Sequence, residues 1–425
     1  MASAELVALI ASLATDERSQ IQRRLHDERK IVDTAPREAV DQVLAATALE
    51  TNKVGYLALL AARSELTDEA GCETLFAKFA GVAVALDPAD LQTAPARLAQ
   101  LSRNVSALAG KVGPAAAMRL VVPMRICLEK VSTSNGHLSS ILVDYLAVCL
   151  MAKAYEAAVP WTRRTIAEIH SEGTTLEVTD VQLIYYYRGL VCLGLKRFDD
   201  AFAMFNLALV VPVDLNEVTV AVFKKYEITS LLCRGYLQSL PRYSSVALRR
   251  IQQYTQPYND IVAAYTSKEN EPVQSLQKAI EKHRAEFVKD ENLGLVQQLV
   301  DSLRQRMVTQ LSAVYDRTSL QLVAEQVALS TPREAEALVL RMIAAGDIVA
   351  RIDHSLGCIS FDEAVSRDAR ADPEESMRKC FDSLSTVCRL KDELATNHWL
   401  IQRNIRDQEL AGSHFLYKER VGDDD

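Results

Sequence analysis

Histidine and cysteine side chains are the groups in this sequence that could bind a metal or act as a nucleophile. The seven histidines lie at positions 26, 137, 170, 283, 354, 398 and 414, and none forms a His-x-His pair. The eight cysteines include no C-x-x-C motif. His354 and Cys358 lie four residues apart, but two ligands do not complete a metal site. The sequence therefore predicts a surface histidine, a buried cysteine and no bound metal.

Motifs for nucleotide binding and for nucleophilic catalysis are also missing. The glycine-containing segment GKVGP at 110–114 does not continue into the Gly-Lys-Ser/Thr pattern of a phosphate loop, and no G-x-S-x-G elbow is present. The consecutive tyrosines at 185–187 could stack on nucleic-acid bases. On a helix, however, they point in three directions, which favours packing. We therefore predict a protein that is not an enzyme and binds no cofactor.

The composition predicts a folded, mostly helical chain. Of the 425 residues, 49% are hydrophobic, and only 15 are glycine and 12 proline. The net charge of −8 disfavours general binding to a nucleic-acid backbone. Cysteines scattered through apolar runs are typical of an intracellular protein with reduced thiols. No apolar run approaches the length of a membrane-spanning helix.

A repeat is visible when the chain is compared with itself. Residues 148–158, VCLMAKAYEAA, match residues 191–201, VCLGLKRFDDA, at an offset of 43 residues. Such an offset is typical of a helical solenoid, and the pattern resembles a tetratricopeptide-type repeat. We expect Gly189 to permit close approach of a neighbouring helix, and Pro212 to stop the second helix. A weaker third copy is expected near 230–243; the alternative is an ordinary helical domain.

A winged helix is predicted over 317–362. A helix at 293–315 leads into it, and a capping box at 318–321 starts a short helix. The next helix begins with Thr331 as its cap and ends at Gly346. Two strands, DIVARID at 347–353 and CISF at 358–361, follow and are joined by HSLG.

The charge of this module favours protein contacts over DNA contacts. Its recognition helix presents Arg333, Glu334, Glu336 and Arg341, and the segment 318–362 has a net charge of −3. An exposed strand edge can instead pair with a strand of another chain. The predicted interaction residues of this wing edge are Ile348, Ala350, Ile352, Ile359 and Phe361.

A long helix is predicted after the wing, over 373–408, followed by a solvated tail at 409–425. Its apolar residues recur at steps of three and four. They are Met377, Phe381, Leu384, Val387, Leu394, Trp399 and Ile401. Such a stripe must be buried, either by folding back on its own domain or in a bundle with helices of partner subunits.

A helical array that runs into an acidic winged helix resembles the PCI domain family, which the proteasome lid, the COP9 signalosome and translation initiation factor 3 share. Within it, the segments 289–303, 318–353 and 358–361 are most similar to the subunit 3 family of the signalosome. The expected fold is mostly α, with a TPR-like helical-repeat array at 1–195 and a PCI domain at 196–365. The helical part of that domain spans 196–316 and the winged helix 317–362.

The resemblance implies a non-catalytic scaffold in a complex that removes a ubiquitin-like modifier from cullins. The zinc isopeptidase of that complex needs a His-x-His pair, which this chain lacks. The family implies contacts with subunits 1 and 8 through the wing and the terminal helix, without a membrane, and a location in cytoplasm and nucleus. The alternatives are a scaffold of the proteasome lid or of initiation factor 3, and a nucleic-acid-binding PCI protein of messenger RNA export.

Overall fold

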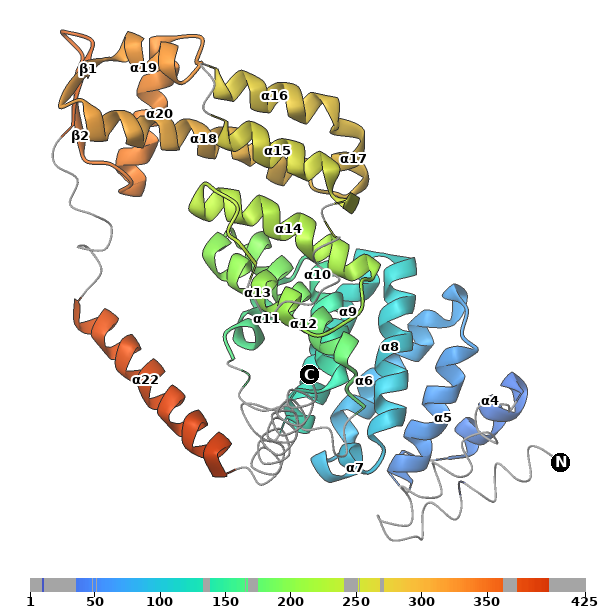
Figure 1. Ribbon diagram of the computed structural model, residues 1–425. Helices are drawn as coiled ribbons and strands as arrows, with labels where there is room; N and C mark the ends of the chain where they lie inside the picture. The colour runs from blue at the N-terminus through green and yellow to red at the C-terminus, as the bar shows by residue number, and fades with distance from the viewer. Residues whose placement is uncertain are drawn as a thin grey trace, which may run out of the picture. The chain divides into compact units, whose positions relative to one another are not determined.

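The computed structural model describes residues 10, 36–47, 49–50, 52–132, 138–164, 166, 175–240, 251, 253–267, 271–361 and 373–396. The chain divides into two compact units, an N-terminal unit, Met1–Arg306, and a C-terminal unit, Met307–Asp425. Helices dominate both units, as Figure 1 shows, so the mostly α prediction is confirmed. The predicted bounds 1–195 and 196–365 do not coincide with these units and stay predictions.

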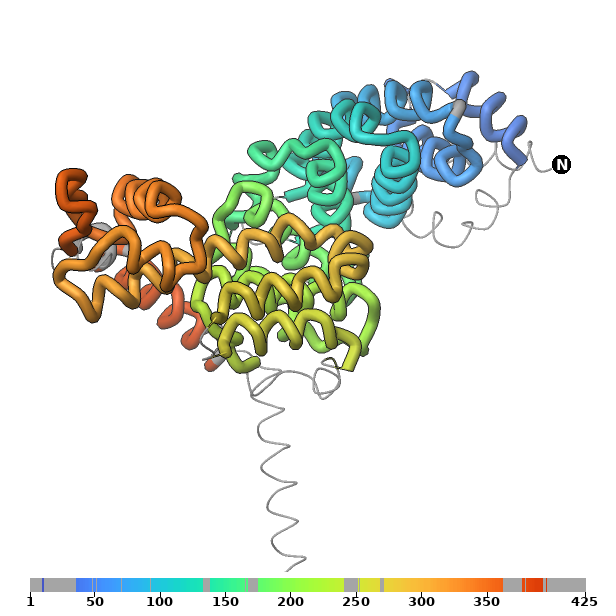
Figure 2. The backbone as a smooth tube through the Cα atoms, turned by 90° about the horizontal axis from the view of Figure 1, so that it is seen from above, coloured from blue at the N-terminus to red at the C-terminus, as the bar shows by residue number. Residues whose placement is uncertain are grey.

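The N-terminal unit consists of helices that pack against their neighbours in chain order, as Figure 2 shows. Its first helices are α4 (Arg37–Ala46), α5 (Lys53–Glu65), η1 (Glu69–Gly71), α6 (Cys72–Ala85), α7 (Pro88–Thr93), α8 (Pro95–Val112), α9 (Pro114–Val131) and α10 (Ser140–Met151). They are followed by α11 (Tyr155–Thr162), α12 (Val178–Gly194), α13 (Phe198–Val210), α14 (Glu217–Arg234), α15 (Gln256–Thr266), α16 (Pro272–Lys282) and α17 (Arg284–Lys289). Helix α18 (Leu293–Val314) crosses from this unit into the next.

The two copies of the predicted repeat end their first helix in the same way. Lys153 after α10 and Lys196 after α12 both adopt the left-handed conformation, with φ of 55° and 57°. In each copy the next amide donates to the carbonyl five residues back: Ala154 to Cys149 and Arg197 to Cys192, both at 2.9 Å. Identical caps at the predicted offset of 43 residues confirm the repeat. Part of the expected third copy, 241–243, lies outside the described residues.

Gly189 lies at the contact between α12 and α13. A Cβ atom built on it would overlap the ring of Phe205, which is completely buried. The predicted close approach is therefore confirmed. Helix α13 ends at Val210, two residues before Pro212, also as predicted.

Replacing Gly189 with alanine is expected to destabilise the fold by about 1–3 kcal/mol, because the ring of Phe205 has no room to move within a packed core. The matched control is Gly81→Ala on the exposed face of α6, where a Cβ would meet nothing within 4 Å. That change should stabilise the protein by about 0.5–1 kcal/mol, since alanine is the better helix former. Urea unfolding measures both; equal effects of the two changes would contradict the close packing.

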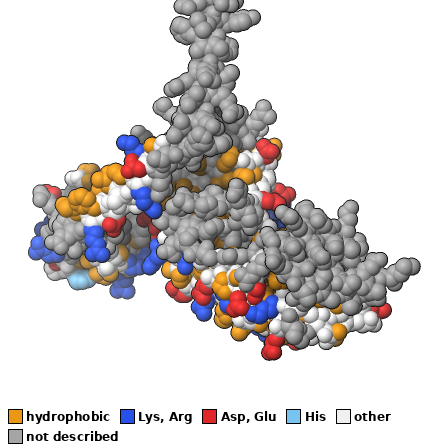
Figure 3. All heavy atoms as spheres, turned by 90° about the horizontal axis from the view of Figure 1, so that it is seen from below, with side chains coloured by type: hydrophobic (Ala, Val, Ile, Leu, Met, Phe, Trp, Pro, Cys, Tyr) orange, Lys and Arg blue, Asp and Glu red, His pale blue; other side chains and the backbone are white. Residues whose placement is uncertain are grey.

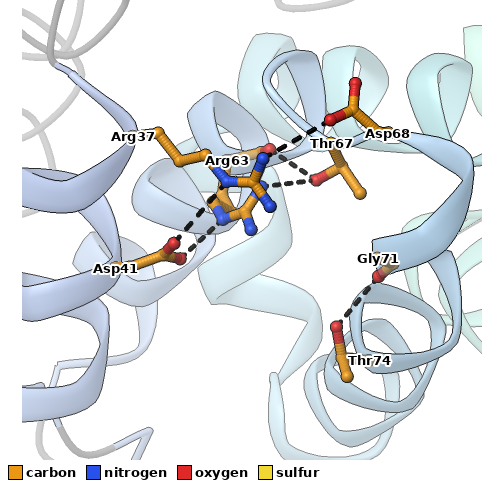
Figure 4. Close-up of polar contacts among 7 residues, drawn as sticks. All are labelled: Arg37, Asp41, Arg63, Thr67, Asp68, Gly71 and Thr74. Atoms are coloured by element: carbon orange, nitrogen blue, oxygen red, sulfur yellow. Dashed lines mark hydrogen bonds and ion pairs between the residues drawn. The ribbon is translucent and has the colours of Figure 1, made fainter.

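Ion pairs and hydrogen bonds join the first helices, as the close-up in Figure 4 shows. Asp41 on α4 accepts from Arg63 on α5 at 2.5 Å, and Arg63 also donates to Thr67 at 2.9 Å. Arg37 pairs with Asp68 at 3.4 Å. The Arg37–Asp68 pair is exposed and contributes little energy, whereas the contacts of Arg63 are part-buried and help to fix the orientation of α4 on α5.

The C-terminal unit contains a three-stranded antiparallel sheet beside two helices. Its elements after α18 are β1 (Arg317–Ser319), α19 (Leu320–Gln326), α20 (Pro332–Ala345), β2 (Ala350–Asp353), β3 (Cys358–Phe361) and α22 (Pro373–Thr396). The strand order is β1-β3-β2. This arrangement is a winged helix, as predicted. Within the described residues, no helix is both long and apolar enough to span a bilayer.

The start of the winged helix differs from the sequence-based prediction. Thr318 is not the cap of the short helix but the middle residue of strand β1, where it pairs with Ile359. The cap of α19 is Ser319, whose hydroxyl accepts from the amide of Leu322 at 3.2 Å. The backbone at 317–319 is in an extended conformation because it pairs with β3, which is distant in sequence. No local signal therefore marks this strand.

Candidate protein-interaction surfaces

Helix α20, at the position of a recognition helix, has the predicted ends. The Thr331 hydroxyl accepts from the amide of Glu334 at 3.3 Å, and Pro332 takes the first helical position. Gly346 closes the helix with φ of 76°. The inner face of α20 is buried, as predicted, at Ala335, Leu338, Val339 and Met342.

The wing is a tight hairpin held by its own turn. Gly357 has φ of 61°, as predicted. The Asp353 carboxylate accepts from the Ser355 hydroxyl at 2.6 Å and from the Ser355 amide at 3.0 Å. These hydrogen bonds, first of all that of the hydroxyl, lower the pKa of Asp353. The wing tip is therefore an ordered turn with an ionised carboxylate at neutral pH.

The predicted wing edge has to be corrected for three of its five residues. Ile359 and Phe361 lie on β3, which is the central strand of the sheet and pairs on both sides. Ile348 precedes β2 and is not part of a strand. All three side chains belong to the core of the winged helix, with exposures of 0%, 8% and 4%. They support the sheet from inside rather than face a partner.

The outer strands of the sheet are β1 and β2. Ala350 and Ile352 lie on β2 and are half-buried. In the described part of the chain, no strand pairs with the outer edge of β2. A role of these two residues in a protein contact stays a prediction. The contact would be made by the backbone of β2 and not by the hairpin as a whole.

Two exposed leucines of the winged helix were missed from the sequence. Leu340 on the outer face of α20 is 50% exposed, and Leu356 at the wing tip is 63% exposed. The exposure of Leu340 could have been predicted, because this residue falls outside the apolar stripe that the sequence of its helix shows. On the face shown in Figure 3, basic and acidic side chains are interspersed over the described atoms without forming one basic groove. Apolar and mixed-charge surfaces suit a protein partner better than a phosphate backbone.

His354 and Cys358, the pair considered as metal ligands, each contact a different group in the structure. His354 is exposed and its Nδ1 lies 3.4 Å from a carboxylate oxygen of Glu336 on α20. Cys358 is half-buried, not fully buried as predicted, and its thiol contacts the Leu356 carbonyl at 3.4 Å. Among the described residues no group of three metal-binding side chains is present.

Helix α22 begins at Pro373, as predicted, and is described to Thr396. Four residues of its predicted stripe, Met377, Phe381, Leu384 and Val387, are between 58% and 64% exposed. The side chain of Leu394 lies outside the described residues, as do Trp399 and Ile401. The structure thus places four large apolar side chains on one exposed helix face.

Comparison with known proteins finds a family match in each half of the chain. Residues 16–248 match the family described as "COP9 signalosome complex subunit 3, N-terminal helical repeats", and residues 280–363 match the "PCI domain".

Two relatives carry the same description. A COP9 signalosome complex subunit 3 of Arabidopsis thaliana is 33% identical over 247 residues, which is 57% of this chain and 56% of that relative. The Dictyostelium discoideum protein of the same description is 28% identical over 338 residues, 76% of this chain and 77% of its own length. The alignment thus spans little more than half of the first relative and about three quarters of the second. The chain belongs to the COP9 signalosome complex subunit 3 family.

Proposed function

We propose that the chain is a non-catalytic scaffold subunit of the COP9 signalosome, the complex that removes a ubiquitin-like modifier from cullins. Membership of the subunit 3 family supports the assignment to this complex. The single observation that carries a scaffold role is the exposed apolar stripe of α22, formed by Met377, Phe381, Leu384 and Val387. A 24-residue helix with such a stripe is suited to a bundle with helices of other chains.

Burial of this stripe would supply most of the binding energy. Covering one large apolar side chain stabilises a complex by about 1.5–3 kcal/mol. Four such residues on one face therefore outweigh the side-chain ordering that assembly requires. The polar residues between them, among them Arg378, Asp382 and Arg389, keep the free helix compatible with water.

The second proposed contact is the outer edge of β2. A strand or loop of a neighbouring subunit would hydrogen-bond to the backbone of Ala350–Asp353, with Leu340 and Leu356 as flanking apolar contacts. The neighbours that the family resemblance implies are subunits 1 and 8. The chain itself supplies no His-x-His pair, so the isopeptidase chemistry belongs to another subunit.

Affinity capture of the tagged full-length chain from extract of its own cells, followed by mass spectrometry, tests this function. We expect the other signalosome subunits, a zinc isopeptidase among them, and deneddylation of cullins by the eluate. Recovery of proteasome or initiation factor 3 subunits, or of RNA with export factors, would contradict the assignment. Fractionation of the same cells is expected to find the chain in both cytoplasm and nucleus.

A further inference from the structure

A small cavity in the N-terminal unit is lined by residues of α8, α10 and α12, where α10 packs against both other helices. Its volume is about 270 Å³. The residues that line it are Arg103, Ser106, Ala107, Ser140, Val143, Asp144, Ala147, Asp180, Leu183 and Tyr187. It is remote in sequence from the winged helix and from α22, and the scaffold role proposed above makes no use of it.

Four polar side chains of this cavity are buried to more than nine tenths, among them Ser140 and Asp180 with exposures of 5% and 6%. Ser106 on α8 is 7% exposed and Asp144 on α10 is 8% exposed. The Ser106 hydroxyl belongs to a residue that lines the open space of the cavity, so it is available to a ligand there.

The carboxyl group of Asp144 is short of compensating charge. Burial raises its pKa from 3.8 to about 7, and the Ser102 hydroxyl and the charge of Arg103 oppose that shift only in part. Asp180 from α12 faces it as a further acid, and its own oxygen already accepts from the Glu177 amide at 3.1 Å. Tyr187 is the remaining titratable neighbour. The cavity thus holds two carboxyl groups, those of Asp144 and Asp180, against the one guanidinium of Arg103.

One part of the cavity wall is apolar. Val143, Ala147 and Leu183 contribute aliphatic surface beside the two polar groups. A ligand that fits both must have an aliphatic stem and a cationic end. Lysine has this form, because its four methylenes lie readily on apolar surface while its ammonium group donates up to three hydrogen bonds. Arginine suits the site less well, since its planar guanidinium is best matched by a bidentate carboxylate within an open surface.

We propose that this cavity binds the side chain of a lysine residue in a partner polypeptide, with the ammonium group donating to Asp144 and Ser106 and the stem against Val143, Ala147 and Leu183. The site is a specificity pocket on the helical-repeat unit. An extended basic segment of a partner would use it as one anchor point, in the way that solenoids bind peptides along their surfaces. Arg103 is an exposed residue of the cavity lining. Its positive charge disfavours a second cationic side chain of the partner next to the bound lysine.

The test uses the full-length chain and Nα-acetyl-lysine methylamide as probe, with the norleucine analogue as the matched neutral compound. Saturation-transfer NMR titration is expected to show binding of the lysine probe with a Kd on the order of 1 mM, which one charge-assisted contact can supply. The norleucine analogue should bind at least about tenfold more weakly. Affinity should also fall at pH values well below 7, where Asp144 is protonated.

Three variants separate the site from non-specific attraction. Asp144→Asn, which replaces a carboxyl by a group of similar shape, should weaken the lysine probe about tenfold or more. Ser106→Ala should weaken it to a smaller extent and supplies an independent check should Asp144→Asn melt early. Asp214→Asn, which removes an exposed acid from the loop before α14, should leave affinity unchanged. Equal binding by wild type and Asp144→Asn, or by both probes, would overturn the proposal.

Discussion

A chain that carries Phe381→Asp and Leu384→Asp is expected to lose its signalosome partners in affinity capture. Both side chains lie on the exposed stripe of α22, with exposures of 64% and 58%. Each substitution removes about 1.5–3 kcal/mol of apolar burial and adds a charge that the bundle would have to desolvate. Together they should reduce affinity by about a hundredfold or more. The eluate should lose deneddylation activity in parallel.

The control for this experiment is the pair Met118→Asp and Val122→Asp on α9. Each of these residues is 53% exposed, and the two lie on one helix face. They differ from the α22 pair because they belong to the N-terminal unit. Because all four positions are exposed, neither variant should change the melting temperature of the free chain by more than a few degrees. Full recovery of partners by the α22 variant would show that its stripe is covered within its own chain. Equal loss from both variants would indicate a general effect of added charge.

Replacing Glu227 with glutamine is expected to change how the stability of the N-terminal unit depends on pH. Glu227 lies on α14, is 1% exposed, and neither of its carboxylate oxygens has a hydrogen-bond partner in the described structure. Burial raises its pKa from 4.5 to about 8. The folded protein therefore holds a proton at neutral pH that the unfolded chain releases.

The sign of the effect follows from this difference in bound protons. Between the unfolded pKa of 4.5 and the folded value of about 8, the folded state binds more protons than the unfolded state. Its free energy of unfolding must then fall as pH rises through this window, and level off above it. The fall should amount to about 3 kcal/mol between about pH 5 and pH 7.5. The glutamine variant lacks this fall and should gain stability over wild type as pH rises.

Urea unfolding of both proteins across this pH range measures the difference. The comparison between variants cancels the contribution of Asp144, whose pKa of about 7 produces a slope of the same sign. Glu217→Gln on the exposed first turn of α14 is the matched control and should run parallel to wild type. A constant offset between Glu227→Gln and wild type at all pH values would show that the Glu227 carboxyl is not perturbed.

Much of the fold was predictable because its signals are local. A cap, a proline at the first turn and a closing glycine specify a helix within a few residues, and Thr331, Pro332 and Gly346 did so for α20. The repeat was visible because similar residues recur at an offset of 43, and the structure gives Lys153 and Lys196 the same left-handed conformation after their helices. The stripe of α22 was equally readable, since helical periodicity is a property of the segment itself.

The features that the sequence did not predict depend on contacts between distant segments. Strand β1 exists only because Thr318 pairs with Ile359, and that pairing makes β3 the central strand and removes Phe361 from the edge. Likewise, Ser106 and Asp144 lie 38 positions apart, and only the packing of α8 on α10 brings them to one cavity. By itself the sequence determined the type of most segments and the ends of helices with strong caps, such as α20, because those depend on local energies. The tertiary structure decided which faces are buried, because burial is set by the partner that a segment meets.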